Sequence, residues 1–181
     1  MVAKAATRYA NAFIKSAIEQ DLLEKAKSDM SMIRKTLQGS SDLRLFLKSP
    51  LIKKEVKNAA LLKVFESKID ELTISLINLL SEKGREELLM GITQSFRDLY
   101  NIHNGIIEVF VTASHQMGDK QKKSLQRKLE SETGKKVQMH TSVDERLIGG
   151  LQVRIDDTVL DGSVKHKLNQ LQETFTAEAV N

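Results

Sequence analysis

The feature that most constrains the fold is a change of hydrophobic period near Gly105. Before this glycine, apolar side chains recur at the spacing that places them on one face of an α-helix. After it, Ile107, Val109 and Val111 alternate with other residues, as in a half-buried β-strand. A helical segment followed by a mixed segment predicts an α+β fold that is mainly α, with a domain boundary at Gly105.

The part before Gly105 is predicted to form a bundle of six helices. Gly39, Pro50 and Gly84 separate successive helices, because glycine favours helix C-termini and proline cannot continue a helix. We expect Asp21 and Ser41 to cap the second and third helices. The fourth helix, from about residue 53 to 66, is expected to bury one apolar stripe: Val56, Ala60 and Val64.

The part after Gly105 is predicted to follow the order β-α-β-β-α. Alternating runs near residues 107–113, 136–141 and 151–155 read as strands, and residues 158–160 could add a last short strand. Asp119 is expected to cap the helix between the first two strands, and Asp161 with Ser163 to begin the closing helix. The closing helix has a single apolar stripe: Val164, Leu168, Leu171 and Phe175.

Composition excludes several classes of function. The 181 residues contain no cysteine, which removes disulfides, thiol nucleophiles and cysteine-bound metals. The net charge of +4 arises before Gly105, and neither half is a polyanion-binding block. The longest apolar runs are a few residues long and the N-terminus has no signal-like segment, so we expect membrane association only through a partner.

The candidate catalytic and metal-binding residues have simpler explanations. The four histidines have no second ligand at a metal-site spacing, and Gly149-Gly150 precedes a strand, where a turn or bulge is expected instead of a phosphate loop. Asp156-Asp157 is typical of a hairpin turn. An enzyme that uses Asp156, Asp157 or Asp161 remains an alternative, and its cleft would contain carboxyl groups with strongly shifted pKa values.

A basic stretch leaves a nucleic-acid-binding module as a second alternative. The stretch could contact phosphates, but no aromatic residue is interleaved for base stacking. A solvated helix face therefore explains it more simply. Its members are Lys120, Lys122, Lys123, Arg127 and Lys128.

Five segments together resemble the δ subunit of F-type ATP synthases, the family of the mitochondrial oligomycin-sensitivity-conferring protein. Their order and spacing span nearly the whole chain. Departures from the family pattern are Ser75-Leu76, where Asn-Phe is frequent, and Met117-Gly118, where Leu-Ser is frequent. The five segments are residues 8–12 (RYANA), 49–52 (SPLI), 79–85 (LLSEKGR), 147–153 (LIGGLQV) and 161–164 (DGSV).

The resemblance implies a structural role without an active site or cofactor. It implies a non-catalytic stator subunit that links the catalytic head to the peripheral stalk, so that proton-driven rotation is coupled to ATP synthesis. Residues 1–105 would bind the N-terminal helix of an α subunit, and residues 106–181 would contact the b subunits. One copy per complex would lie at the cytoplasmic face of a bacterial plasma membrane.

The resemblance places the α-subunit groove between the first and fifth helices. The fifth helix, residues 70–83, carries more apolar surface than one core-facing stripe needs, which indicates a second apolar face for a partner. Phe13, Leu76 and Leu79 could instead be ordinary core residues. Gly84 and Arg85 are expected to end one helix and begin the next, and not to contact the partner. The candidate groove residues are Tyr9, Ala12, Phe13, Ser75, Leu76 and Leu79.

Overall fold

The chain forms two compact units, which are described separately. The computed structural model describes the backbone of residues 2–178 and the side chains of residues 4–172, so the side chain of Phe175 lies outside the described residues. Unit 1 comprises Met1–His103 and unit 2 comprises Asn104–Asn181. Helices predominate and one small mixed sheet is present, which confirms the α+β, mainly α class.

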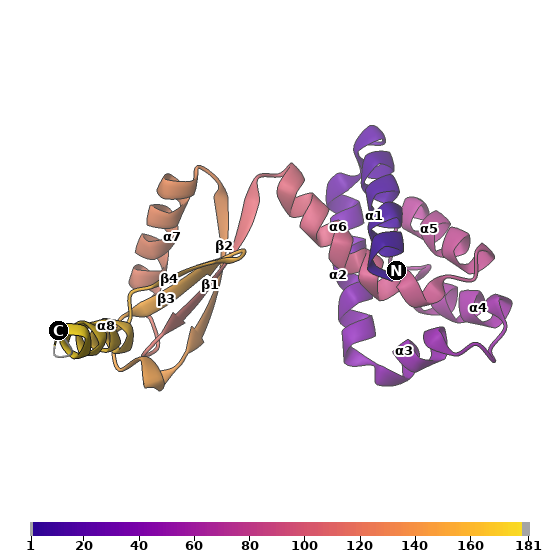
Figure 1. Ribbon diagram of the computed structural model, residues 1–181. Coiled ribbons are helices and arrows are strands. Elements are labelled where there is room, and N and C mark those ends of the chain that lie inside the picture. The colour runs from indigo at the N-terminus through magenta and orange to yellow at the C-terminus, as the bar shows by residue number, and fades with distance from the viewer. Residues whose placement is uncertain (1, 179–181) are drawn as a thin grey trace. The chain divides into compact units, whose positions relative to one another are not determined.

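Unit 1 consists of helices and a short 3-10 turn, within the described residues (Figure 1). Helices α1 and α6 pack along each other, and α2 packs against α6. The bounds are α1 Val2–Glu19, α2 Leu23–Gly39, α3 Ser41–Lys48, α4 Lys54–Phe65, α5 Glu71–Glu82, η1 Glu86–Leu88 and α6 Leu89–His103.

Small residues let α1 and α6 approach closely. A Cβ added to Gly91 of α6 would lie 3.1 Å from the Cβ of Ala6, a contact tighter than ordinary packing. Beside this contact, the rings of Phe13 and Phe96 meet edge to face with centroids 5.5 Å apart. Aromatic pairs favour this arrangement, and both side chains are buried, so the α1–α6 contact is the centre of the core of unit 1.

The N-cap positions differ from the predicted capping residues by one position. The side chain of Ser40, not Ser41, accepts a hydrogen bond from the Leu43 N–H, at 3.1 Å. The N-cap position of α2 is Leu22 without a side-chain cap, because Asp21 adopts a left-handed backbone with φ of 56°. The predicted caps Asp21 and Ser41 are therefore wrong.

In unit 2 the third predicted cap is also displaced. Helix α7 begins with Asp119 itself, and the residue at its N-cap position is Gly118. The Gly118 N–H donates to the side-chain oxygen of Gln121 at 2.9 Å, which is the reciprocal contact of a capping box, and the cap predicted at Asp119 is wrong.

The predicted stripe of α4 is also wrong. Val56 and Val64 are exposed, whereas the buried side chains of this helix are Lys57, Leu61 and Phe65. Lys57 enters the core because its Nζ donates to the carbonyl oxygen of Leu47 at 2.8 Å. A buried lysine breaks the apolar pattern by which the buried face of a helix is recognised.

Unit 2 is a four-stranded sheet with the strand order β2-β1-β3-β4 (Figure 1). Strand β1 runs parallel to β2, which returns through α7, and antiparallel to β3, which forms a hairpin with β4. Strand β4 is the last short strand that the sequence offered at residues 158–160. The bounds are β1 Ile106–Ala113, α7 Asp119–Thr133, β2 Lys136–Val143, η2 Glu145–Leu147, β3 Leu151–Ile155, β4 Thr158–Asp161 and α8 Val164–Glu178.

One face of this sheet is apolar and carries α7. Val109, Val111 and Val153 are buried on it together with Leu129 of α7. Period-2 alternation places the neighbours of these residues on the opposite face. There the Phe110 ring stacks on His140 with centroids 5.0 Å apart, and the Arg154 guanidinium lies over the same ring, 4.7 Å from its centre.

The turns and helix ends of unit 2 agree with the sequence in two places. Asp156 and Asp157 form the tight turn between β3 and β4, with Asp156 at φ of 49°. At the start of α8, the Ser163 N–H donates to Asp161 at 2.9 Å, and the Ser163 hydroxyl accepts from the His166 N–H at 3.1 Å. Among the described residues, none of the helices is both long and apolar enough to cross a bilayer.

Candidate functional site

The first wall of the candidate groove is α1, whose small residues face the core. Ala6, Ala10 and Ala17 are buried, and Phe13 fills the space between them and α6. Ala12 lies on the exposed side of the helix, and Tyr9 is half-buried. The outward side of α1 therefore presents a small residue where a partner backbone could approach closely.

The second wall is α5, whose N-terminus is fixed by buried polar contacts. Asp70 caps the helix by accepting from the Leu72 N–H at 3.1 Å. The buried carboxylate of Asp29 on α2 accepts from the Asp70 N–H and from the Thr73 hydroxyl, both at 2.8 Å. Lys25, 2.7 Å from the Asp70 carboxylate, lowers the pKa of that group. These contacts hold α5 against α2 at one end.

Further along α5, one large apolar side chain stays in solvent. Leu76, Ile77 and Leu80 are buried, but Leu79 is 41% exposed and Ser75 is exposed. A helix that is fixed at its end and buries a full apolar face does not need Leu79 for its own packing. Leu79 is therefore surface that the unit leaves available.

Arg85 connects α1 with the segment that follows α5. Gly84 ends α5 with φ of 61°, a conformation that side chains rarely adopt, and this turn redirects the chain. The Arg85 guanidinium then donates to the Tyr9 hydroxyl at 3.4 Å and lies 6.0 Å from the centre of its ring. Sequence reasoning assigned Arg85 only to a helix start, and no local pattern links it to a tyrosine 76 positions earlier.

The structure divides the six candidates into two groups. Phe13 and Leu76 are buried in the core, with exposed fractions of 4% and 6%. The others reach the surface of α1 or α5 to different degrees, and both helices pack against η1. The surface group is Tyr9, Ala12, Ser75 and Leu79.

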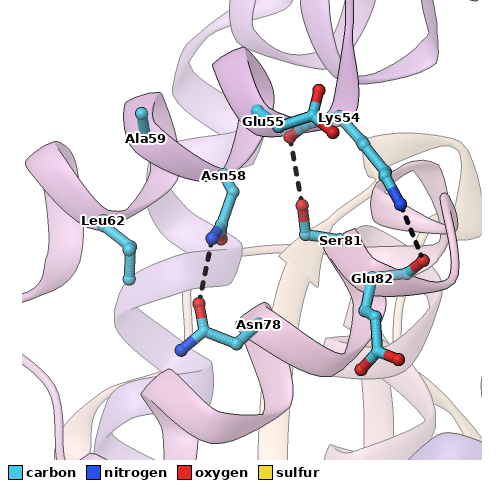
Figure 2. A pocket seen from close by; sticks show the side chains of 8 residues that line it. All are labelled: Lys54, Glu55, Asn58, Ala59, Leu62, Asn78, Ser81 and Glu82. Atoms are coloured by element: carbon cyan, nitrogen blue, oxygen red, sulfur yellow. Dashed lines mark hydrogen bonds between the residues drawn. The ribbon is translucent and has the colours of Figure 1, made fainter.

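Helix α5 also meets α4 around a pocket of about 370 Å³. Figure 2 shows Asn58 of α4 donating from its side-chain amide to Asn78 of α5, at 3.0 Å. The Ser81 hydroxyl donates to the Lys54 carbonyl oxygen at 3.1 Å. This lining contains no histidine or arginine, and its hydrogen bonds join the two helices.

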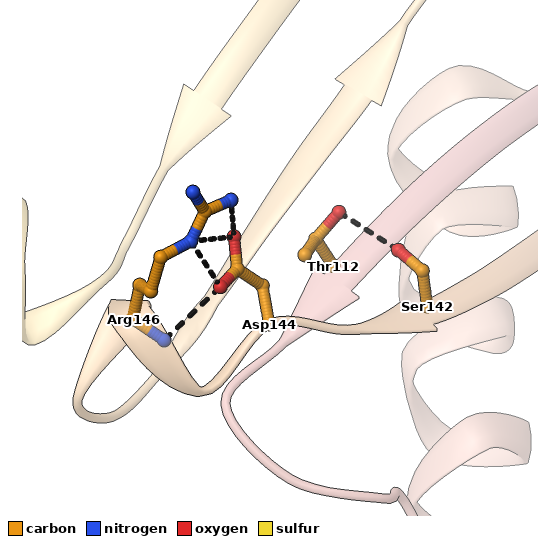
Figure 3. Close-up of polar contacts among 4 residues, drawn as sticks. All are labelled: Thr112, Ser142, Asp144 and Arg146. Atoms are coloured by element: carbon orange, nitrogen blue, oxygen red, sulfur yellow. Dashed lines mark hydrogen bonds and ion pairs between the residues drawn. The ribbon is translucent and has the colours of Figure 1, made fainter.

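Two carboxyl groups of unit 2, those of Asp144 and Asp161, have structural roles. The Ser163 N–H and hydroxyl lower the pKa of Asp161, and the Arg146 side chain and backbone N–H lower that of Asp144 to about 2 (Figure 3). A general acid needs its pKa raised instead. Among the described residues, no cluster of three or more histidine and acidic side chains could hold a metal ion.

Comparison with known proteins gives matches over almost the whole chain. Residues 5–175 match the family described as "ATP synthase delta (OSCP) subunit". The protein named "ATP synthase subunit delta" from Chlorobaculum tepidum is 40% identical over 174 residues, which cover 96% of each chain. The protein of the same name from Chlorobium phaeovibrioides is 41% identical over 173 residues, again 96% of each chain.

Solved structures also resemble this fold along most of the chain. A chain in the cryo-EM structure of the Toxoplasma gondii mitochondrial ATP synthase hexamer aligns with a TM-score of 0.70 and 26% sequence identity. The alignment covers 94% of this chain and 97% of the other. The likeness thus includes both units.

Proposed function

The chain belongs to the ATP synthase delta (OSCP) subunit family, and from this premise we propose that its two units are the two ends of a stator connection. The chain is a structural subunit of an ATP synthase and not an enzyme in its own right. Its task is to keep the catalytic head from turning with the central shaft. A stator of this kind transmits force through contacts between proteins, without bond chemistry.

We propose that unit 1, as a six-helix bundle, binds the N-terminal helix of an α subunit of the head. The observation that carries this proposal is the exposed Leu79 on α5, a helix whose end is already fixed by Asp29. Ala12 on α1 supplies a small residue where a partner helix could approach closely. Phe13 and Leu76 would support the groove from beneath, since both are buried.

We propose that unit 2 contacts the b subunits of the peripheral stalk. Two separate contacts on one chain raise the effective concentration of each partner for the other, so each contact can be of moderate strength. Resistance to torque depends on slow dissociation, which comes from a few buried apolar anchors in each contact. One copy would serve each complex, at the cytoplasmic face of a bacterial plasma membrane.

The proposed groove is tested by titrating a synthetic α-subunit N-terminal peptide into the full-length chain by calorimetry. Leu79→Glu and Ala12→Asp should each weaken binding by more than about 1.4 kcal/mol, a tenfold loss, because a charge would be placed in an apolar contact. Leu45→Glu is the matched control, since Leu45 of α3 is 66% exposed and lies outside the groove.

Circular dichroism must show that each variant keeps the helical content of the parent chain. Wild-type peptide affinity in a folded Leu79→Glu variant would refute the groove. An equal loss of peptide affinity in the Leu45→Glu control would contradict a binding site between α1 and α5.

A further inference from the structure

Ile148 adopts a backbone conformation that β-branched residues rarely take. Its φ is 65° and its ψ is −43°. The Gly149 N–H donates to the Leu147 carbonyl oxygen at 2.7 Å, across Ile148. A three-residue turn with this bond and a positive central φ is the strained form of the γ-turn. A branched Cβ at such a position adds steric strain that glycine would avoid.

Burial does not compensate this strain. The Ile148 side chain is 66% exposed, so it gains little from packing within its own unit. A strained residue persists only where its surroundings enforce its conformation, and such residues concentrate at functional sites. The combination of strain and exposure calls for a role outside the fold of unit 2.

Contacts hold the segments on both sides of Ile148, and Figure 3 shows those between Asp144 and Arg146. The Asp144 carboxylate accepts from the Arg146 backbone N–H at 3.0 Å and from its guanidinium at 2.8 Å. On the other side, Gly150 leaves no room for a side chain, because a Cβ there would lie 2.4 Å from the Gly162 carbonyl oxygen. The turn is therefore held by contacts on both sides of an exposed isoleucine.

Helix α8 extends the apolar surface that Ile148 begins. The Val164 N–H donates to the Gly149 carbonyl oxygen at 2.9 Å, and a Cβ on Gly149 would lie 2.9 Å from a Val164 methyl group. Leu168 and Leu171 follow Val164 at helical spacing, and all three are between 40% and 54% exposed. We call Ile148, Val164, Leu168 and Leu171 the knob surface.

Basic side chains flank the knob surface on both sides. The 3.6-residue period places Lys165 on one side of the α8 stripe and Lys167 on the other. Both are exposed, and residues 162–172 contain no acidic side chain. Lys165 is near enough to η2 to contribute to the lowered pKa of Asp144.

We propose that the knob surface binds one amphipathic helix of the peripheral stalk, with acidic residues beside the partner's apolar stripe and with Ile148 as the anchor. This inference rests on the stator role proposed above. The stripe from Val164 to Leu171 covers about two helical turns, which an equal length of partner helix would cover. Lys165 and Lys167 would then lie beside the partner's carboxylates at the rim of the contact.

The charges disfavour a second copy of this chain as the occupant. Two knob surfaces face to face would bring the Lys165 and Lys167 pairs of both copies together. Opposed like charges are unfavourable in an interface, whereas an acidic partner is attracted and oriented by the same lysines.

The decisive variant is Ile148→Gly, which removes the anchor and the strain together. In the full-length chain, the melting temperature of unit 2 should stay the same or rise, because glycine tolerates a positive φ. Affinity for a soluble fragment of the stalk b subunit, measured by calorimetry, should fall about tenfold or more. A lower melting temperature, or unchanged affinity, would overturn the proposal.

Two further variants test the location and the charge. Val159→Asn is the matched control: Val159 is 50% exposed in the β3–β4 hairpin, and its replacement should leave affinity for the b fragment unchanged. The pair Lys165→Glu and Lys167→Glu should weaken binding most at low salt, since salt screens exposed charges. A loss in the Val159 variant, or charge reversal without effect, would contradict the assigned surface.

The same titrations separate this inference from the stator role. If the wild-type chain binds the b fragment and Ile148→Gly binds it equally well, the knob surface is wrong but the stator role stands. If the wild-type chain binds neither the b fragment nor the α-subunit peptide, the stator role itself fails and this inference fails with it.

Discussion

The two units solve the same packing problem in different ways. Unit 1 ties its helices together with buried polar groups that have hydrogen-bond partners, among them Asp29, Lys57 and Thr73. In the described part of unit 2, the one buried polar residue is Ser163. Buried polar contacts that are satisfied make a core rigid and specific. Unit 1 is thus organised before it meets a partner, whereas unit 2 gathers apolar side chains on an open surface.

The difference has a mechanical meaning for a stator. A groove whose walls are already fixed loses little conformational entropy on binding, so its affinity comes largely from direct contacts. An exposed apolar helix gains stability when a partner covers it. We therefore expect unit 1 to be the more stable part of the free chain, and unit 2 to gain more from assembly.

Among the substitutions that compare the two units, the largest loss of stability is expected for a change at Gly150. Gly150→Ala would place a Cβ 2.4 Å from a carbonyl oxygen, at a φ of 77°. The free energy of unfolding of unit 2 should fall by about 4 kcal/mol, the sum of backbone strain and overpacking. Both tyrosines, Tyr9 and Tyr100, lie in unit 1, so tyrosine fluorescence should report an unchanged transition while circular dichroism shows early loss of unit 2.

Gly118→Ala is the control for that experiment. Gly118 lies in the same unit at an ordinary φ, and its added Cβ would meet only a glutamine side chain, at 3.8 Å. If Gly150→Ala shifted the tyrosine transition as much as the dichroism, the two units would unfold as one and the comparison would be broken.

An intermediate loss of stability is expected for a substitution of Glu86 in unit 1. Its carboxylate lies 4.0 Å from the Lys57 ammonium, and both side chains are almost fully buried. Glu86→Ala would leave the Lys57 ammonium buried against the Leu47 carbonyl oxygen without a compensating negative charge, which should cost about 3 kcal/mol of unfolding free energy in urea denaturation.

The double variant Lys57→Met with Glu86→Met sharpens this test. It should recover most of the lost stability, because apolar replacement of a buried ion pair is close to neutral. A double variant as unstable as Glu86→Ala alone would show that the pair is not what ties α4 to η1.

The smallest effect is expected from the Asp144–Arg146 contact in unit 2. The folded-state pKa of Asp144 is about 2, below the unfolded value of about 3.9. The contact therefore stabilises the unit above the unfolded pKa, and this contribution is lost as the pH falls toward the folded pKa.

Asp144→Asn should remove that part of the acid dependence. The protection of the β3 amides against hydrogen exchange, corrected for the intrinsic pH dependence of exchange, should then fall less steeply with acid than in the parent chain. Asp157→Asn, which replaces an exposed carboxylate in the β3–β4 turn, should keep the parent profile. Identical profiles for Asp144→Asn and the parent would contradict the assigned contact.

The sequence predicts helices and strands well where the hydrophobic period changes or ends at a residue that stops helices or forms turns. The change of period at Gly105, the helix stop at Gly84 and the turn at Asp156-Asp157 are all confirmed, because each depends on local backbone preference. The α4 stripe is wrong for a non-local reason. Lys57 is buried by partners in α3 and η1, which the hydrophobic pattern of α4 alone does not reveal.

The candidate groove shows the same limit. Helical spacing identifies the apolar positions on α1 and α5, but it does not separate Phe13 and Leu76, which are buried, from Leu79, which is exposed. The contact of Arg85 with Tyr9 depends on how the chain turns at Gly84. The strain at Ile148 is equally hidden, because it is a property of the backbone angle and not of the residue type.

The central claim is that one chain holds two bodies at once. Its most direct test is sedimentation of isolated catalytic head with the soluble b-subunit fragment, with and without the full-length chain. We predict that the fragment sediments with the head only when the chain is present, and that Leu79→Glu or Ile148→Gly each reduces this recovery. Recovery of the fragment with the head in the absence of the chain, or no recovery in its presence, would contradict the account.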